Sequence, residues 1–163
     1  MKLATELREA IRAKPDYAEA FYTLGTILKQ QGKLQESVTA LREALRLEPD
    51  FAGAHTTLAT VLKQLGDAEG AATEARAGAE LAKRKTDLQA ALFATNSGKR
   101  LRNAGDLEGA VSQFRSAINA ARDFAPAHYE LGLALRQQGK KDEAAKEFTE
   151  ARMLDPKLAA PDN

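Results

Sequence analysis

Hydrophobic residues recur along this chain at the spacing of helices. Phe21, Leu24 and Leu28 share one helical face, and after an intervening glycine Val38 and Leu41 begin a second face. Apolar residues at i, i+3, i+4 and i+7 predict amphipathic helices. The alternation of apolar and polar residues that is typical of strands is absent from the sequence. The pattern therefore predicts an all-α protein that is built from pairs of helices.

Four glycines divide this pattern into repeats. Gly32, Gly66, Gly105 and Gly139 stand in similar phrases and are separated by 34, 39 and 34 residues. A glycine directly after the last periodic residue is a signal for the end of a helix. Each repeat should therefore consist of a helix, a tight turn, a second helix and a short loop. The period is 34 residues, with five residues inserted between the second and third copies.

Proline marks the ends of some second helices, and the insertion suggests where another helix starts. Pro15, Pro49 and Pro156 fall in one phase of the repeat, and proline cannot continue a helix. The insertion lies near residues 85–90, where Thr86 or Asp87 would be a good N-cap. We therefore expect the first helix of the third copy to start there and to be about one turn longer.

The repeat resembles the tetratricopeptide repeat family. The resemblance rests on Leu-Gly in the first helix, on Ala in the second helix and on the closing proline. The copies at 18–51 and 125–158 match best, whereas 52–85 has Lys83 in place of the proline and 91–124 has Ser97 in place of the leucine. The resemblance implies a right-handed α-solenoid of antiparallel helix pairs, which is a single array over residues 1–163.

The array is expected to contain four full repeats and two partial ones. Residues 1–17 correspond to the second helix of a truncated repeat, and residues 159–163 to the start of an incomplete one. The segments between them are repeat 1 (18–51), repeat 2 (52–85), the insertion (86–90), repeat 3 (91–124) and repeat 4 (125–158).

In this family the first helix of each pair lines a concave groove, so the resemblance implies a set of peptide-binding residues. Carried over to this sequence, the set is Tyr22, Thr26, Lys29, Gln30, Thr56, Thr60, Lys63, Gln64, Thr95, Lys99, Arg102, Asn103, Tyr129, Leu133, Arg136 and Gln137. It includes a row of cations, one per repeat (Lys29, Lys63, Arg102 and Arg136), beside a row of amides (Gln30, Gln64, Asn103 and Gln137). Cations bind carboxylates and amides bind peptide backbone, which favours an extended acidic peptide as partner. The alternative is that these are solvated residues, alike only because the repeats are alike.

One subtype of the family can be tested on the sequence. Members that clamp the carboxylate of chaperones have Lys and Asn in the first helix of one repeat and Arg in a later one. Here the first pair falls on Tyr22 and Thr26 or on Thr56 and Thr60. The clamp pattern is absent, so a chaperone co-factor of that kind is not expected.

Composition narrows the classes of function further. Lys and Arg number 24 and Asp and Glu 23, which gives a net charge of +1, and there is no cysteine. Disulfides, thiolate zinc sites and a cysteine nucleophile are therefore excluded. The region 83–102 is locally basic, which would allow weak nucleic-acid binding. The alternative, which we favour, is a solvated helix end, because the whole chain is almost neutral and no aromatic residues interleave.

No catalytic motif is present, so we expect neither an enzyme nor a cofactor. Phosphate-binding glycine loops, zinc-protease motifs and nucleophile elbows are all missing from the sequence. His55 and His128 occupy the same repeat position two repeats apart and are interpreted as packing residues, not as metal ligands.

The sequence Asn96-Ser97-Gly98 lies in the middle of a predicted helix and can be interpreted in two ways. It could form a kink or a polar binding spot, or its small residues could allow a neighbouring helix to approach closely. We favour close approach.

A second functional hypothesis is a structural or self-associating segment of a larger protein. The last helix has no following repeat to cover its apolar stripe, and open solenoid ends need polar caps. End-to-end homodimerisation is therefore expected through Ala144, Ala145, Phe148 and Ala151. A membrane span and a signal-peptide layout are both missing from the sequence, so a soluble, cytoplasmic protein is expected if the chain is complete.

Overall fold

The computed structural model describes residues 7, 11 and 16–158. The described residues form seven helices, α2 to α8, and no strand, which confirms the all-α helical-repeat class. The chain divides into two compact units, Met1–Lys83 and Arg84–Asn163. Most of the expected half-repeat at 1–17 and all of 159–163 lie outside the described residues. Leu7 and Ile11 are helical and pack against Leu24 and Leu28.

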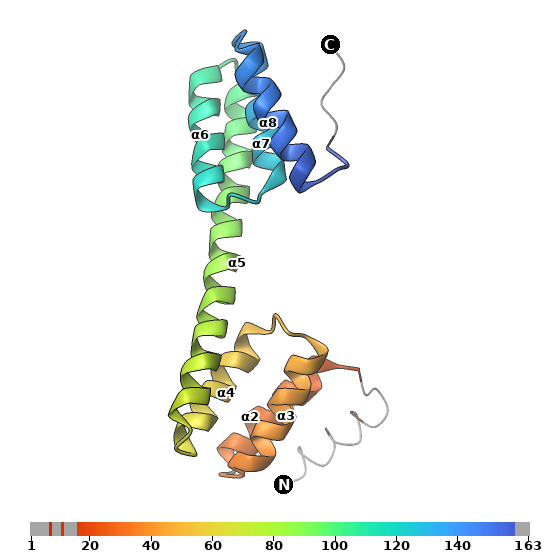
Figure 1. The fold of residues 1–163 in the computed structure, drawn as a ribbon, viewed down its shortest axis with the longest axis vertical. Helices are drawn as coiled ribbons and strands as arrows, with labels where there is room; N and C mark the ends of the chain where they lie inside the picture. The colour runs from red at the N-terminus through yellow and green to blue at the C-terminus, as the bar shows by residue number, and fades with distance from the viewer. Residues whose placement is uncertain (1–6, 8–10, 12–15, 159–163) are drawn as a thin grey trace. The chain divides into compact units, whose positions relative to one another are not determined.

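The first unit contains α2 (Ala18–Gln30), α3 (Leu34–Leu47), α4 (Ala52–Gln64) and the start of α5 (Ala68–Asn103). Helix α3 packs against α2 on one side and against α4 on the other, and α2 also touches α4 (Figure 1). The core between α3 and α4 is built from apolar stripes that the sequence predicted, with Leu41 and Leu58 fully buried.

The second unit contains the end of α5, α6 (Leu107–Ala120), α7 (Ala125–Gln137) and α8 (Lys141–Leu154). Helix α7 packs between α6 and α8 (Figure 1). Phe114 of α6 and Leu135 of α7 are almost fully buried in its core. Each unit therefore has a hydrophobic core of its own.

The four glycine turns have one and the same hydrogen-bonding pattern. In the first turn the N–H of Gly32 donates to the carbonyl of Lys29 (3.1 Å), and the N–H of Lys33 donates to the carbonyl of Leu28 (2.9 Å). The two bonds define a Schellman motif, which needs a left-handed residue after the helix. Gly32 has φ +73°, and Gly66, Gly105 and Gly139 have φ from +80° to +87°. The predicted helix ends are confirmed.

Proline ends the second helices where it is present. Helix α3 stops at Leu47, just before Pro49, and α8 stops at Leu154, just before Pro156. Helix α6 stops at Ala120 without a proline in that phase. There the break is enforced by Pro126 at the start of α7, because its ring would clash with the carbonyl four residues earlier in a continuous helix.

The expected break at the insertion is wrong. Helix α5 runs without interruption through 36 residues, and Thr86 and Asp87 lie inside it instead of capping a new helix. The physical reason is that residues 50–125 contain no proline, and 83–90 contain no glycine either. Helix-favouring residues such as Lys, Arg, Leu, Gln and Ala fill most of that junction, so nothing local stops the helix.

Glycines in the first helices allow the two helices of a pair to approach closely. A Cβ on Gly98 would lie 2.5 Å from the Phe114 ring, and one on Gly132 would lie 2.7 Å from the Phe148 ring. The interpretation of Asn96-Ser97-Gly98 as a close-approach segment is therefore confirmed. None of the described helices combines the length and the apolar composition that a membrane-spanning segment requires.

Candidate protein-interaction surfaces

The first-helix face of the first unit carries half of the predicted groove residues. On α2, Tyr22, Thr26 and Lys29 are half-buried, whereas their α4 equivalents Thr56, Thr60 and Lys63 are exposed, as are the amides Gln30 and Gln64. The α4 residues are more exposed because they line an open groove between α4 and α5. The structure thus brings these eight residues onto two neighbouring helices.

Several polar groups on this face are already used within the helices. The hydroxyls of Thr26, Thr56 and Thr60 each donate to the carbonyl four residues earlier, at 3.0 Å. The ring of Tyr22 packs on Phe51, with 4.7 Å between the ring centres. The groups that project from this face with free hydrogen-bonding capacity are therefore mainly the lysines and the amides.

In the second unit the cations of the row are engaged by the protein itself. The guanidinium of Arg102 forms an ion pair with Glu130, and the ammonium of Lys99 lies 3.6 Å from the other oxygen of that carboxylate. Glu130 is only 9% exposed. Arg136 stacks over the Phe148 ring, 5.8 Å from its centre. This face is consequently much less available to an acidic ligand than the sequence suggested.

The other predicted groove residues of the second unit divide into exposed and covered ones. Asn103 and Gln137 are exposed, whereas Tyr129 and Leu133 are half-buried against the core. Thr95 is 3% exposed, so it cannot line an open groove. It is covered because its position faces the inside of the unit.

The two histidines make the same set of contacts in repeats 2 and 4. His55 Nδ1 lies 2.6 Å from Glu74 Oε2, and its Nε2 lies 2.9 Å from the carbonyl of Pro49. The equivalent distances from His128 to Glu147 and to the carbonyl of Arg122 are 2.7 and 3.0 Å. Each ring links a first helix to its second helix and to the preceding loop, which agrees with a packing role.

The predicted self-association end is largely inside the second unit. Ala144, Phe148 and Ala151 are 2%, 9% and 0% exposed, because this stripe of α8 packs onto α7 of its own repeat. Ala145 alone of the four is exposed. The expectation that all four form an uncovered apolar end is therefore corrected for three of them.

The basic region 83–102 is partly neutralised. Besides the contacts of Glu130 with Lys99 and Arg102, the guanidinium of Arg84 lies 3.6 Å from the carboxylate of Asp123. Both Arg84 and Asp123 are well exposed, so their pairing is weak. Local acids therefore reduce the positive potential that made nucleic acid a candidate partner.

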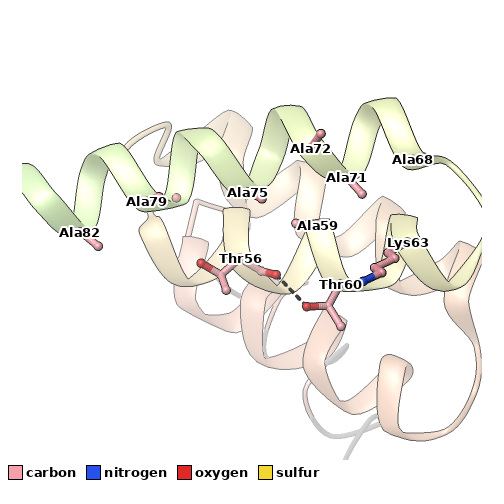
Figure 2. Close-up of a pocket in the computed structure, with 11 residues that line it drawn as sticks. Thr56, Ala59, Thr60, Lys63, Ala68, Ala71, Ala72, Ala75, Ala79 and Ala82 are labelled. Atoms are coloured by element: carbon pink, nitrogen blue, oxygen red, sulfur yellow. Dashed lines mark hydrogen bonds between the residues drawn. The ribbon is translucent and has the colours of Figure 1, made fainter.

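An apolar groove runs between α4 and the start of α5 in the first unit. Its volume is ≈ 610 Å³, and it is lined by Thr56, Ala59, Thr60 and Lys63 of α4 and by Ala68, Ala71, Ala72, Ala75, Gly78, Ala79 and Ala82 of α5. Figure 2 shows the alanines of α5 above the threonines of α4. Gly78 allows this close approach, since a Cβ there would lie 2.8 Å from Thr56 Oγ1.

Comparison with sequence families decides the class of the protein. A family model described as "TPR repeat" matches residues 25–66, and one described as "Tetratricopeptide repeat" matches residues 95–159. The chain is a tetratricopeptide-repeat protein. The presence of these repeats supports a general role as a protein-interaction scaffold. Proteins of this family are generally not enzymes.

Several solved structures are similar to this tetratricopeptide-repeat (TPR) chain. A fragment of MamA from Desulfovibrio magneticus RS-1 is 21% identical, with 96% of this chain and 85% of that chain covered and a TM-score of 0.49. YrrB, described as a TPR protein with an unusual peptide-binding site, is 19% identical, with 94% of both chains covered and a TM-score of 0.40. PilF of Pseudomonas aeruginosa is 25% identical, with 86% and 64% covered and a TM-score of 0.40. Among curated proteins, none matches this sequence.

Sequence reasoning missed two features of this TPR chain. The first is Glu130, which forms ion pairs with two cations of the predicted groove. The sequence did contain a signal for it, because Glu130 is an acid at a repeat position that is occupied by Thr23, Thr57 and Asn96 in the other three repeats. The second is the α4–α5 groove, which exists because α5 does not break. It could not be anticipated while a helix start was expected at 86–87.

Proposed function

We propose that the first unit binds an extended acidic peptide along the first-helix face of α2 and α4. Lys29 and Lys63 would bind its carboxylates, and Gln30 and Gln64 would bind its backbone. The proposal refines the general scaffold role of the family and assigns a binding function, with no catalytic step and no cofactor.

One observation carries this proposal. Lys29 and Lys63 occupy equivalent positions on neighbouring helices, and within the described residues neither ammonium has an ion-pair partner. Their equivalents in the second unit, Arg102 and Arg136, are held by Glu130 and stacked on Phe148. Within this row, the two cations that the described residues leave without such a contact, Lys29 and Lys63, thus both lie on the first unit.

The chemistry of these side chains fits a peptide better than a rigid small ligand. Lysine is a flexible point charge that reaches carboxylates at varied positions. Each glutamine amide offers both a donor and an acceptor, which is what an extended backbone requires. Because both lysines lie in the last turn of their helices, part of their charge is balanced by the helix dipole, so moderate affinity and salt dependence are expected.

The experiment measures binding of two fluorescent peptides by anisotropy. One peptide is rich in Asp and Glu, and the other has Asn and Gln at the same positions. The variant carries Lys29→Glu and Lys63→Glu, and the control carries Arg42→Glu and Arg76→Glu, two exposed cations of α3 and α5 with the same change in charge. The acidic peptide should bind the wild type and the control, and the variant at least about tenfold more weakly. Equal binding of both peptides, or equal weakening by the control, would contradict the proposal.

A further inference from the structure

The start of α5 exposes a face that is covered in the second helices α3 and α6. In α3, Val38 and Leu41 are 6% and 0% exposed, because α4 packs on them. The equivalent α6 residues, Val111 and Phe114, are covered in the same way by α7. One period after α3, the α5 positions are Ala72, Ala75 and Ala79, all three exposed along the groove.

The end of α5 exposes large apolar side chains, whereas the start of α5 exposes small ones. Phe93 is 72% exposed, although its equivalents Ala20, Ala54 and Ala127 are 4%, 0% and 0% exposed. Leu88 and Leu92, on the same stretch of helix, are 47% and 51% exposed. In repeats 2 and 4 this position is where the first helix packs onto the preceding helix.

The sizes of the side chains on the two faces are matched. Between α3 and α4, the first helix (α4) contributes the small residue Ala54, and the second helix (α3) contributes the large residue Leu45, which packs against the core cluster that contains Ala54. Between α6 and α7, small Ala127 is clustered with large Ile118. At the junction of repeats 2 and 3 the equivalents are Phe93 and Ala79, so the large residue has moved to the first helix and the small one to the second. Close packing requires such compensation of volume.

These two faces belong to one uninterrupted helix. Two stretches of one uninterrupted α-helix cannot pack against each other, because each residue advances the chain by about 1.5 Å along the axis. Within a single copy with α5 intact, the Phe93 face therefore cannot enter the alanine groove. A Phe93 face that fills this groove has to belong to another copy of the chain.

We propose that a second copy of this chain fills the groove. The end of α5 from one copy, with Leu88, Leu92 and Phe93, docks into the α4–α5 groove of the other, and the exchange is reciprocal. A reciprocal exchange between identical chains gives a closed two-fold dimer in which both grooves and both apolar faces are buried. The docked helix takes the position that the first helix of repeat 3 has in a regular array, and it continues the α2–α4 face instead of blocking it.

The absence of cysteine from the chain allows a direct test of which helix fills the groove. One copy carries Ala79→Cys and a second copy carries Phe93→Cys, and the mixture is oxidised and run on a non-reducing gel. The expected product is a covalent dimer that forms only in the mixture. A chain that carries both cysteines and instead crosslinks within itself, as a monomer, would overturn the proposal.

Sedimentation velocity over a concentration series measures the dimer itself. Phe93→Glu should raise the dimer Kd at least about tenfold, since a large residue at the centre of an interface dominates affinity. Met153→Glu is the matched control and should leave the Kd unchanged. Like Phe93, Met153 is an exposed apolar residue of the second unit, with 67% of it exposed. Both positions are exposed, so circular dichroism should show both variants folded. A monomeric wild type, or equal effects of the two variants, would overturn the proposal.

Dimerisation and peptide binding can fail separately. The Phe93→Glu variant should still bind the acidic peptide through Lys29 and Lys63. Loss of the dimer with retained peptide binding supports both proposals, whereas a monomeric wild type that binds the peptide overturns the dimer alone.

Discussion

At the scale of single residues, the turns combine one fixed requirement with variable surroundings. The left-handed glycine is present in all four turns. The residue directly after this glycine differs between turns, and the residue three positions further on differs with it. In repeats 2 and 3 an aspartate caps the next helix, and the N–H of Gly70 or Gly109 donates to it at 2.8 or 2.9 Å. In repeats 1 and 4 a lysine stands there with a glutamate three residues on, as in Lys33 and Glu36. A Cβ on Gly70 or Gly109 would lie too close to that carboxylate, so a larger residue three positions after the aspartate would require the aspartate side chain to shift.

Gly139 allows the cost of the left-handed conformation to be measured alone. It has φ +80°, and no atom lies within 4 Å of the position where a Cβ would be. Gly139→Ala should therefore lower the free energy of unfolding by about 1–2 kcal/mol through backbone strain only. Gly139→Asn should cost less, because asparagine tolerates this conformation. Urea unfolding of the three proteins checks the order, and an alanine variant as stable as the wild type would contradict it.

At the scale of helices, the decisive feature is the absence of proline between α4 and α6. Lys83 occupies the repeat position of Pro49 and Pro156, and there α5 continues. The continuous helix leaves the alanine groove and the Phe93 face open. Helix α5 thus lacks both kinds of stop found in the other second helices: the proline in this phase, which ends α3 and α8, and a proline at the start of the next helix, such as Pro126 after α6.

Lys83→Pro should end α5 as Pro49 ends α3. The end of α5 could then fold back onto the groove of its own chain, so we expect a change from dimer to monomer. Sedimentation velocity measures this change, and the mixed-cysteine crosslink should be lost while the crosslink within one chain appears. Lys83→Ala is the control and should remain dimeric, since alanine favours a helix. A dimer that persists in the proline variant would contradict the expectation.

The elements show which features a sequence can predict. Helix pairs, glycine turns and proline ends follow from signals within a few residues, and they are correct for α2, α3, α4, α7 and α8. The break at Thr86 was wrong because a good N-cap residue does not stop a helix that has no breaker before it. The Glu130 pairings and the burial of Thr95 depend on which helix faces which, and a local pattern does not contain that information.

At the scale of the whole molecule, the chain contains two units that each have a core. Leu41 and Leu58 lie in the core of the first unit, and Phe114 and Leu135 in that of the second. In repeat proteins stability is approximately a sum of terms from repeats and their neighbours. A local defect should therefore act mainly within its own unit.

Phe114→Ala tests this separation. Removing a fully buried phenylalanine should cost about 3–5 kcal/mol in the second unit. Amide hydrogen exchange should become faster in α6, α7 and α8, whereas the amides of α2 and α3 should keep their protection. Leu41→Ala is the reciprocal variant and should accelerate exchange in the first unit. Uniform acceleration in both units by either variant would show that the chain unfolds as one cooperative body.

The Schellman turns also bear on how such a chain can change over evolutionary time. Each turn is closed by backbone bonds within a few residues and requires only a glycine, so gene duplication can add a whole 34-residue copy with its turn already functional. Mutations can then accumulate on the faces of the new copy while the turn persists. The Lys-Glu and Asp-Gly versions in this chain are two sets of side chains around the same turn backbone.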